Sequence, residues 1–327
     1  MKYFITSDIH SFYKPLIDAL KEAGYDQNNP DHILVVNGDL FDRGPGSVEL
    51  LSFVKSLPRE KRILIRGNHE YLLRDILKKD VPESYDYSNG TVKTCYDLYI
   101  NKYPKSRIKE LMIQMAKDDY MDAYNGEEFW KDTRNFNDIA RWVIDPIRWG
   151  HIKKYIKSTG IIDWIFSDEW VNYLEIDKYI ITHSFIPLYN FHGSYSDFSR
   201  YEPNWRNCAT PKQWIEATWG CPYYEVEDGY FDEEKKNGKI LVCGHWHASD
   251  FHQRYERPEL WCDIYHMPRP MFEIFYGQDM IALDACTVLS GMCNILVIND
   301  SDMSIHDQHG NTLTEELSKS RTLSLIK

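Results

Sequence analysis

The first eighty or so residues repeat one pattern, in which a short apolar run ends at a polar residue and an amphipathic segment follows. The apolar runs span residues 3–6, 33–36 and 62–65, and the segments 16–24 and 47–57 between them carry apolar residues at helical spacing. Strands and helices that alternate in this way predict a parallel sheet with right-handed crossovers. Ligands of such sheets bind beyond the carboxyl ends of the strands, which is where all three polar stops lie.

Aspartate and histidine dominate the polar residues that end the predicted strands, including two later strands predicted at 179–182 and 239–243. The residues in question are Asp8, His10, Asp39, Asn68, His69, His183, His245 and His247. Carboxylate, imidazole and amide-oxygen ligands suit Mn, Fe or Zn better than Ca or Mg. A lone histidine is more often a hydrogen-bonding residue than a ligand. The joint occurrence of these residues, each after a β-type run, nevertheless favours a metal site at the edge of the sheet.

The regular alternation stops near residue 81 and returns near residue 177. Within that interval, residues 108–115 and 139–143 have the apolar spacing of amphipathic helices. The tail contains four further strand candidates: 260–264, 271–275, 280–283 and 294–298. We therefore expect a single domain over residues 1–327 with a mostly helical insertion at 81–177, which we call the cap.

Charge and hydropathy argue against several classes of protein. The chain has 38 Lys and Arg against 50 Asp and Glu, and its formal net charge of −12 disfavours an extended nucleic-acid surface. No apolar run approaches the roughly 18 residues of a membrane span, and the N-terminus turns polar too soon for a secretory signal. Seven cysteines without a C-x-x-C pair fit reduced thiols. We expect a cytoplasmic protein without membrane association; the sequence carries no indication of its oligomeric state.

Five motifs resemble the signatures of calcineurin-like metallophosphoesterases. They are D-I-H at 8–10, G-D-L-F-D-R-G at 38–44, R-G-N-H-E at 66–70, T-H-S at 182–184 and G-H-W-H at 244–247. The second and third motifs have the form seen in the branch of serine/threonine protein phosphatases and diadenosine tetraphosphatases. Residues 281–297 resemble the late hairpin of that branch. The resemblance implies an α/β fold with a four-layer α/β/β/α core, in which two mixed sheets are flanked by helices.

The resemblance also implies two divalent metal ions, with Mn expected and Fe or Zn as alternatives. The ligands of the first ion would be Asp8, His10, Asp39 and His247. The ligands of the second ion would be Asp39, Asn68, His183 and His245, with the Asp39 carboxylate bridging the two ions. Two cations about 3.5–4 Å apart hold the phosphate oxygens and make hydroxide available near neutral pH.

Three more residues receive roles from the resemblance. His69 directly follows Asn68, so it can project over the metals without binding them, and it would act as the general acid for the leaving alkoxide. Asp42 would hold His69 protonated and oriented; the alternative is that Asp42 caps the following helix. Arg43 would bind the non-bridging phosphate oxygens; the alternative is an ion pair with Glu49.

The motifs mix two branches of the family. The protein phosphatase branch usually has a second phosphate-binding arginine between the fourth and fifth motifs, where this chain offers Arg200 and Arg206 outside any recognisable motif. His247 is the second histidine that generic metallophosphoesterases use and protein phosphatases lack. Arg66 is expected to brace its loop rather than to bind phosphate.

Tryptophan is concentrated outside the motifs, since eight of the ten lie within residues 120–220. We expect them to form the core of a small helical cap. The alternative is that a few line the mouth of the site and stack on a nucleobase or an aryl ester. The charged run at 228–236 is expected to be a solvated loop.

The expected function is hydrolysis of a phosphomonoester, either a phosphoprotein or a small phosphate ester, by a metal-bound hydroxide. Asn68 and Arg43 would bind the phosphate. The alternative is a dinucleoside polyphosphate or cyclic nucleotide hydrolase. A nuclease is less expected, because residues 153–157 are the only local basic candidate. A non-catalytic scaffold is disfavoured because every predicted ligand is present together with His69, Asp42 and Arg43.

Overall fold

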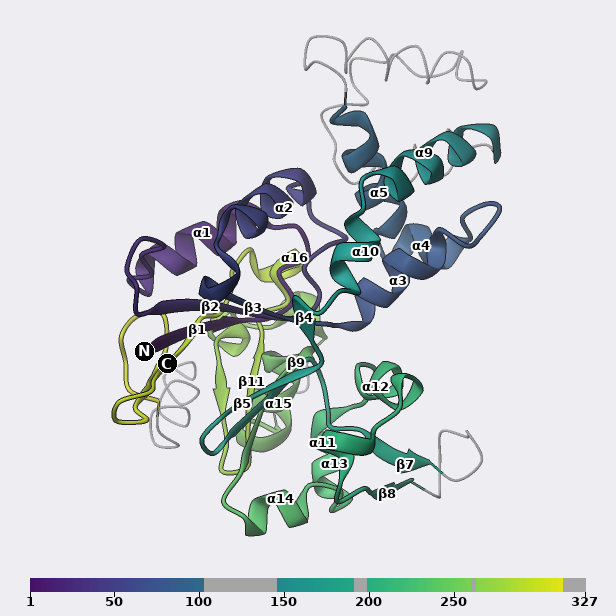
Figure 1. The fold of residues 1–327 in the computed structure, drawn as a ribbon. Coiled ribbons are helices and arrows are strands. Elements are labelled where there is room, and N and C mark those ends of the chain that lie inside the picture. Colours follow the sequence, from purple (N-terminus) through teal and green to yellow (C-terminus); the bar gives the residue numbers. More distant parts are fainter. Residues whose placement is uncertain (103–145, 191–198, 260–262, 314–327) are drawn as a thin grey trace.

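The computed structural model describes residues 1–102, 146–190, 199–259 and 263–313 (Figure 1). The helices expected around 108–115 and 139–143 lie outside the described residues. Among the described helices, none combines the length and the apolar character that a membrane crossing requires.

Two large mixed sheets form the centre of the molecule. The first sheet has the order β13 (Ile305–His306), β12 (Leu296–Asn299), β1 (Lys2–Thr6), β2 (His32–Asn37), β3 (Arg62–Ile65) and β4 (Trp170–Val171). The second has the order β10 (Phe275–Tyr276), β11 (Met280–Asp284), β9 (Ile240–His247), β6 (Tyr179–Thr182) and β5 (Tyr173–Ile176). The strands β1 to β4 are parallel, as are β6, β9 and β11. The alternation in the first eighty residues therefore predicted β1, β2 and β3 correctly, and β4 is a fourth parallel strand that it did not predict.

Alternate residues along each strand serve different cores, which places the two sheets face to face. In β1, Ile5 belongs to the core between the sheets, and Phe4 belongs to the core under the outer helices. In β9, Val242 faces the core between the sheets and Leu241 faces the outer side. The arrangement is the expected four-layer one, with helices on both outer faces (Figure 1).

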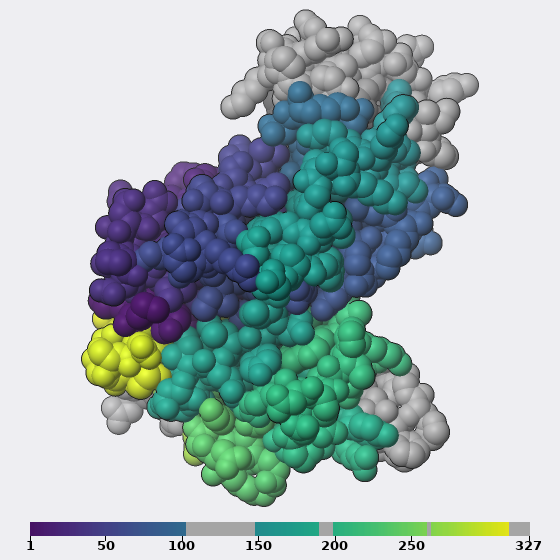
Figure 2. Space-filling model, in the orientation of Figure 1, coloured from purple at the N-terminus to yellow at the C-terminus, as the bar shows by residue number. Residues whose placement is uncertain are grey.

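Most helices pack on the outer side of one sheet or the other. The helices of the first half and the cap are α1 (Tyr13–Glu22), α2 (Ser47–Ser56), α3 (Asn68–Ile76), α4 (Ser84–Ser88), α5 (Thr91–Ile100), α9 (Pro146–Ser158) and α10 (Ile161–Ile165). The later helices are α11 (Trp205–Cys208), α12 (Pro211–Ala217), α13 (Pro222–Glu227), α14 (Asp232–Lys236), α15 (Ala248–Phe251) and α16 (Thr287–Ser290). A short hairpin of β7 (Leu188–Asn190) and β8 (Ser199–Tyr201) precedes α11. Figure 2 shows the first group on one half of the molecule and residues 199–259 on the other.

The described part of the cap is helical only as far as Ile165. Beyond it, β4 pairs with β3 in the first sheet and β5 pairs with β6 in the second. Residues 170–176 therefore belong to the core sheets, and the expected boundary at 177 is too late. That the helical residues form a cap within one domain stays a prediction.

The strand expected at 271–275 is wrong except at its last residue, and the described end of the strand expected at 260–264 is not extended. Residues 264–266 and 269–272 form short 3₁₀ turns, and strand β10 covers only Phe275–Tyr276. Pro268 and Pro270 explain the difference, because proline cannot donate a backbone hydrogen bond within a sheet. Residues 260–262 lie outside the described residues.

The described tryptophans of residues 149–214 are buried in two separate hydrophobic cores. Trp149, Trp164 and Trp170 are buried in the core over the first sheet. Trp205 and Trp214 are buried on the outer side of the second sheet, so the expectation of one helical core is wrong for these two. Trp130 and Trp142 lie outside the described residues.

Candidate active site

The ends of five strands meet at one edge of the two sheets and bring the predicted ligands together. The first sheet supplies five of these residues, at or after the ends of β1, β2 and β3: Asp8, His10, Asp39, Asn68 and His69. The second sheet supplies the other three: His183 after β6, and His245 and His247 within β9. The strand β9 reaches His247, whereas the predicted strand ended at residue 243. The close grouping follows from the topology, because the carboxyl ends of parallel strands meet at one edge.

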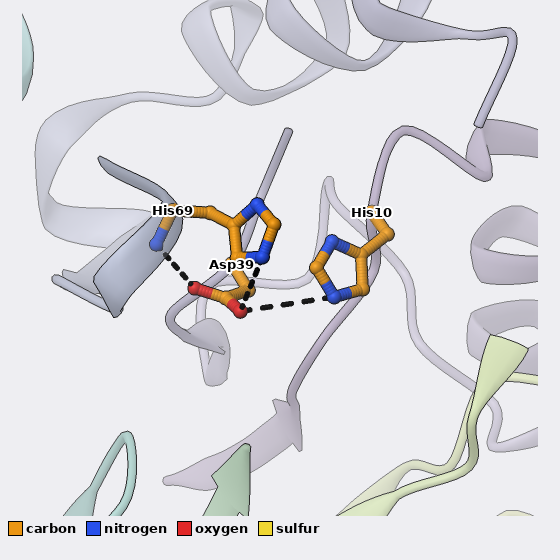
Figure 3. Close-up of side chains that lie close together, drawn as sticks. All are labelled: His10, Asp39 and His69. Carbon is orange, nitrogen blue, oxygen red and sulfur yellow. Dashed lines mark hydrogen bonds and ion pairs between the residues drawn. The ribbon is translucent and has the colours of Figure 1, made fainter. Parts of the chain in front are cut away.

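Asp39 lies at the centre of two clusters of possible metal ligands. One cluster is His10, Asp39 and His69, and the other is Asp39, His183 and His245; within each, the ligand atoms lie within 4.8 Å of one another. Asp39 Oδ2 is 3.7 Å from His10 Nε2 and 3.8 Å from His69 Nε2 (Figure 3). Asp39 Oδ1 is 3.3 Å from His183 Nε2. One oxygen of Asp39 therefore faces each cluster, as a bridging ligand requires.

Asp8 and His247 lie beside these two clusters rather than in them. Asp8 Oδ2 accepts the backbone N–H of His245 at 2.9 Å. His247 Nε2 is 3.8 Å from Asp284 Oδ2, and His247 Nδ1 is 3.8 Å from Asp250 Oδ2. That Asp8 and His247 bind the first ion stays a prediction.

Burial favours the neutral imidazole forms of His10 and His245. It holds the pKa of His10 well below its usual value and lowers the pKa of His245 to about 2. His10 Nδ1 is 3.0 Å from the carbonyl oxygen of Phe41, and His183 Nδ1 is 3.0 Å from that of Asn37. A carbonyl can only accept a hydrogen bond, so the proton of each neutral ring belongs on Nδ1. The lone pair then stays on Nε2, which faces the cluster.

The Asn68 amide meets a ring of acceptor atoms. One end of the amide lies 2.9 Å from His183 Nε2, 3.1 Å from His245 Nδ1 and 3.2 Å from both Asp39 oxygens. With nitrogen at that end the amide donates to them; with oxygen there, acceptors face acceptors and a cation is needed between them. Burial also raises the pKa of Asp39 well above its usual range, and the negative charge of Asp8 raises it further. The donor set and its buried negative charge therefore fit divalent ions.

Glu70 forms hydrogen bonds with two loops of this centre. The sequence assigned it no role. Its buried carboxylate accepts the backbone N–H groups of Gly67 at 2.7 Å, Leu40 at 2.9 Å and Asp39 at 3.0 Å. The loops after β2 and β3 are thus held by one side chain. The only signal in the sequence was the final letter of the R-G-N-H-E motif.

The backbone of the centre lies unusually often in the left-handed region. Six predicted site residues have positive φ: Asp8 (53°), His10 (48°), Asp39 (52°), Asp42 (78°), Arg43 (61°) and His245 (65°). For residues other than glycine this costs on the order of 1–3 kcal/mol each, and such residues cluster at functional sites. The packing around the centre therefore holds the backbone of these residues in conformations that the isolated chain would avoid.

His69 forms a buried pair with Asp42. His69 Nδ1 is 2.7 Å from Asp42 Oδ2, and Arg43 Nη2 is 3.5 Å from His69 Nε2. Burial acts to lower the pKa of His69, but the carboxylates of Asp39 and Asp42 outweigh it, so this pKa lies above its usual value. The sequence placed His69 outside the ligand set, whereas the geometry includes it among the possible ligands of the first cluster.

Arg66 and Arg206, which the sequence analysis considered near the phosphate site, bind protein groups. Arg66 donates to the carbonyl oxygens of Ile165 and Ser167 at 3.0 and 2.8 Å and to Asn172 Oδ1 at 3.0 Å, so it braces the chain between α10 and β5. Arg206 pairs with Glu175 and with Glu234. Neither guanidinium lies in the clusters around Asp39.

Glu234 also corrects the expectation of a solvated loop at 228–236. Its side chain in α14 is 2% exposed and accepts from Trp205 Nε1 at 2.9 Å and from Arg206 Nη1 at 2.7 Å. Arg200, the other candidate for a second phosphate-binding arginine, lies over the ring of Tyr189.

Residues 1–249 match the family model of calcineurin-like phosphoesterases, and all the residues around Asp39 fall within that range. The chain therefore belongs to the family of calcineurin-like phosphoesterases. Two curated relatives share a short stretch of sequence with this chain. The symmetrical bis(5'-nucleosyl)-tetraphosphatase of Proteus mirabilis is 35% identical over 79 residues, 24% of this chain and 28% of that protein. The asymmetrical bis(5'-nucleosyl)-tetraphosphatase of Bacillus velezensis is 40% identical over 76 residues, 21% of this chain and 30% of that protein.

The matched segments thus span less than a third of the curated relatives' length. Among solved structures, a serine/threonine phosphatase from Saccharomyces cerevisiae is 12% identical with a TM-score of 0.44, covering 96% of this chain and 82% of that one. A cold-active protein tyrosine phosphatase from a Shewanella species is 14% identical with a TM-score of 0.43, covering 96% and 80%.

Proposed function

We propose that the chain hydrolyses phosphomonoesters of alcohols, in a phosphoprotein or a small molecule, at the centre around Asp39. The observation that carries the proposal is the His69–Asp42 pair, 2.7 Å apart, beside the shared carboxylate. An alkoxide is a poor leaving group and needs a proton as it departs. A buried histidine whose far nitrogen faces the cluster can supply that proton.

Two divalent ions, when bound, supply an activated water and positive charge for the phosphate oxygens. Asp39, His10, His183, His245 and Asn68 would hold them, with Asp8 and His247 completing the set. His69 keeps a proton at Nε2 for the leaving oxygen, while Asp42 accepts the hydrogen bond from Nδ1 and orients the ring.

Arg43 is the phosphate-binding candidate. Its side chain is exposed, and its Nη2 is 3.5 Å from His69 Nε2. A planar guanidinium in that place can donate to non-bridging phosphate oxygens while the leaving oxygen faces the histidine. We propose that Arg43 acts without a second arginine of the kind the sequence suggested, since Arg206 is paired with two glutamates.

A dinucleoside polyphosphate is the second candidate substrate. The two relatives named above are tetraphosphatases of that kind, although the similarity covers only 28% and 30% of their length. Trp219 adds a structural reason: it is half-buried, and its ring meets that of His245 edge-on with centroids 5.7 Å apart. An indole in that position could stack on a base.

Kinetics on a substrate panel test the proposal. The Mn-loaded full chain is assayed on glycerol 2-phosphate, a phosphoserine peptide, bis(4-nitrophenyl) phosphate and diadenosine tetraphosphate, with bound metal measured in parallel. We expect the highest kcat/KM on the monoesters. A preference for the tetraphosphate would support the second candidate, and a metal-loaded chain that cleaves none of these would contradict both.

A further inference from the structure

The Asp42 carboxylate is fully buried, and hydroxyl groups of the cap surround it. Its Oδ2 accepts from Thr91 Oγ1 at 2.7 Å as well as lying 2.7 Å from His69 Nδ1. Its Oδ1 accepts from Thr94 Oγ1 at 2.7 Å. Thr94 Oγ1 in turn accepts the backbone N–H of Asp42 at 3.0 Å. Three donors therefore determine how this carboxylate is turned.

Both threonines lie in the first turn or so of α5, three residues apart and so on one face of the helix. Both are 1% exposed, and Asp42 is not exposed at all. The hydroxyls replace the water that would otherwise solvate the carboxylate, and unlike water they are attached to a helix.

The start of α5 also holds the backbone next to Asp42. Gly90, at φ 83°, lies so close to Arg43 that a Cβ would overlap its backbone nitrogen. Lys93 Nζ donates to the carbonyl oxygen of Gly44 at 2.9 Å. The loop that carries Asp42 and Arg43 is thus in contact with α5 along three consecutive residues.

Packing of the cap determines where α5 lies. Val92, Cys95 and Leu98 are buried in the same core as Trp149 and Ile152 of α9. The cap helices therefore determine the position of both hydroxyls relative to the edge of the first sheet.

We infer that Thr91 and Thr94 are positioning residues that hold Asp42, and through Asp42 the ring of His69, in the orientation that donates a proton to the leaving group. The inference rests on the proposed function. It gives the cap a part in the chemistry: α5 supplies the hydroxyls that the proton-donating pair needs.

Leaving groups of different basicity separate this role from a merely structural one. Thr91→Val, Thr94→Val and the double variant are assayed on glycerol 2-phosphate and on 2,4-dinitrophenyl phosphate, whose leaving group needs no proton. We expect kcat on the alkyl ester to fall about tenfold for each single variant and about 100-fold for the double variant, with KM little changed, as is typical for general-acid catalysis. On the dinitrophenyl ester all three should stay within about threefold of the unmodified chain.

Three controls accompany the valine variants. Thr91→Ser and Thr94→Ser keep the hydroxyl and should restore most of the rate. Val92→Ala disturbs the buried face of α5 and leaves both hydroxyls in place. The ratio of kcat on glycerol 2-phosphate to kcat on 2,4-dinitrophenyl phosphate should therefore not change. Thr159→Val removes a cap hydroxyl that donates only to a helix carbonyl, that of Ile156, and should behave likewise.

Proton NMR gives a readout that does not depend on activity. The Nδ1 proton of His69, bonded to Asp42, should resonate far downfield, disappear in His69→Asn, and be lost or shifted in the double valine variant. An unchanged resonance, or equal loss of rate on both esters, would overturn the inference. An inactive chain in which the resonance still depends on the threonines would contradict the proposed function, and it would support only the positioning of Asp42 and His69 by Thr91 and Thr94.

Discussion

His69 Nδ1 lies 2.7 Å from Asp42 Oδ2, and the opposite nitrogen of the same ring lies 3.8 Å from Asp39 Oδ2. The imidazole therefore lies between the buried carboxylate of Asp42 and the Asp39 carboxylate shared by the two clusters of possible metal ligands. Two roles are compatible with that placement: a proton donor that Asp42 orients, or a ligand of the first cluster. The difference between them is measurable.

Replacing His69 by asparagine should lower kcat on alkyl monoesters by about 10²–10⁴-fold, because general acid catalysis contributes on this order. Bound Mn, measured by elemental analysis after desalting, should stay near the unmodified value. If metal content falls in step with kcat, His69 belongs to the ligand set. The matched comparison is His183→Asn, which should lose metal and activity together.

Replacing Asp39 by asparagine should remove the response to metal. The buried carboxylate faces both clusters, so its loss weakens both metal positions. In a thermal melt, saturating Mn should raise the Tm of the unmodified chain, since a ligand at 100 times its Kd stabilises by about 2.7 kcal/mol. The Tm of Asp39→Asn should not move with Mn. In the metal-free state the variant should be at least as stable as the parent, because it no longer buries this charge. An Mn-dependent shift of the parental size would contradict the bridging role.

The fold was largely predictable, because most strands of the sheets were visible as apolar runs with polar stops. The strands β3 and β6 match the predicted ranges 62–65 and 179–182. The tail was not predictable in this way. Residues 271–275 have the composition of a strand, but Pro268 and Pro270 just before them prevent strand formation. Apolar content could not distinguish these two outcomes.

The site was predictable to the extent that parallel strands share an edge. The residues missed were those whose partners are distant along the chain and whose own surroundings are unremarkable in sequence. Thr94 bonds to Asp42 across 52 positions, and Glu234 lies in a charged run yet is buried by Arg206 and Trp205. Nothing local to these residues indicates which partner the fold brings to them.

Replacing Glu70 by alanine should destabilise the chain by about 3 kcal/mol or more. The variant leaves three backbone N–H groups without their present acceptor, and each buried unpaired group costs about 1–3 kcal/mol. Urea unfolding of the metal-free protein measures the loss. Glu49→Ala is the control, because Glu49 is exposed in the first turn of α2 and should change stability by less than about 0.5 kcal/mol. Equal losses in the two variants would contradict the structural role of Glu70.

Glu225 should make stability depend on pH. Burial raises its pKa to about 7 from the usual 4.5, and Asp228 adds to the shift. The folded chain therefore binds this proton more tightly than the unfolded chain, so the contribution is present below pH 4.5 and is lost as pH rises through 7. Glu225→Gln should gain about 1 kcal/mol over the parent at pH 8, after allowance for solvent screening, and nothing at pH 4. Equal differences at both pH values would contradict this assignment.

Trp219 should decide between the two candidate substrates. Its half-buried ring lies edge-on to that of His245, and only a substrate that carries a base or an aryl group could stack on it. Stacking on an aromatic side chain contributes about 1–3 kcal/mol, so Trp219→Ala should raise KM for diadenosine tetraphosphate about tenfold or more. Trp219→Phe keeps an aromatic face and should recover much of the difference. Glycerol 2-phosphate has no ring that could stack on Trp219, so its KM should stay within about twofold of the parental value in both variants. If alanine leaves KM for the tetraphosphate unchanged, Trp219 does not bind a base, and the case for a nucleotide substrate then rests on the relatives alone.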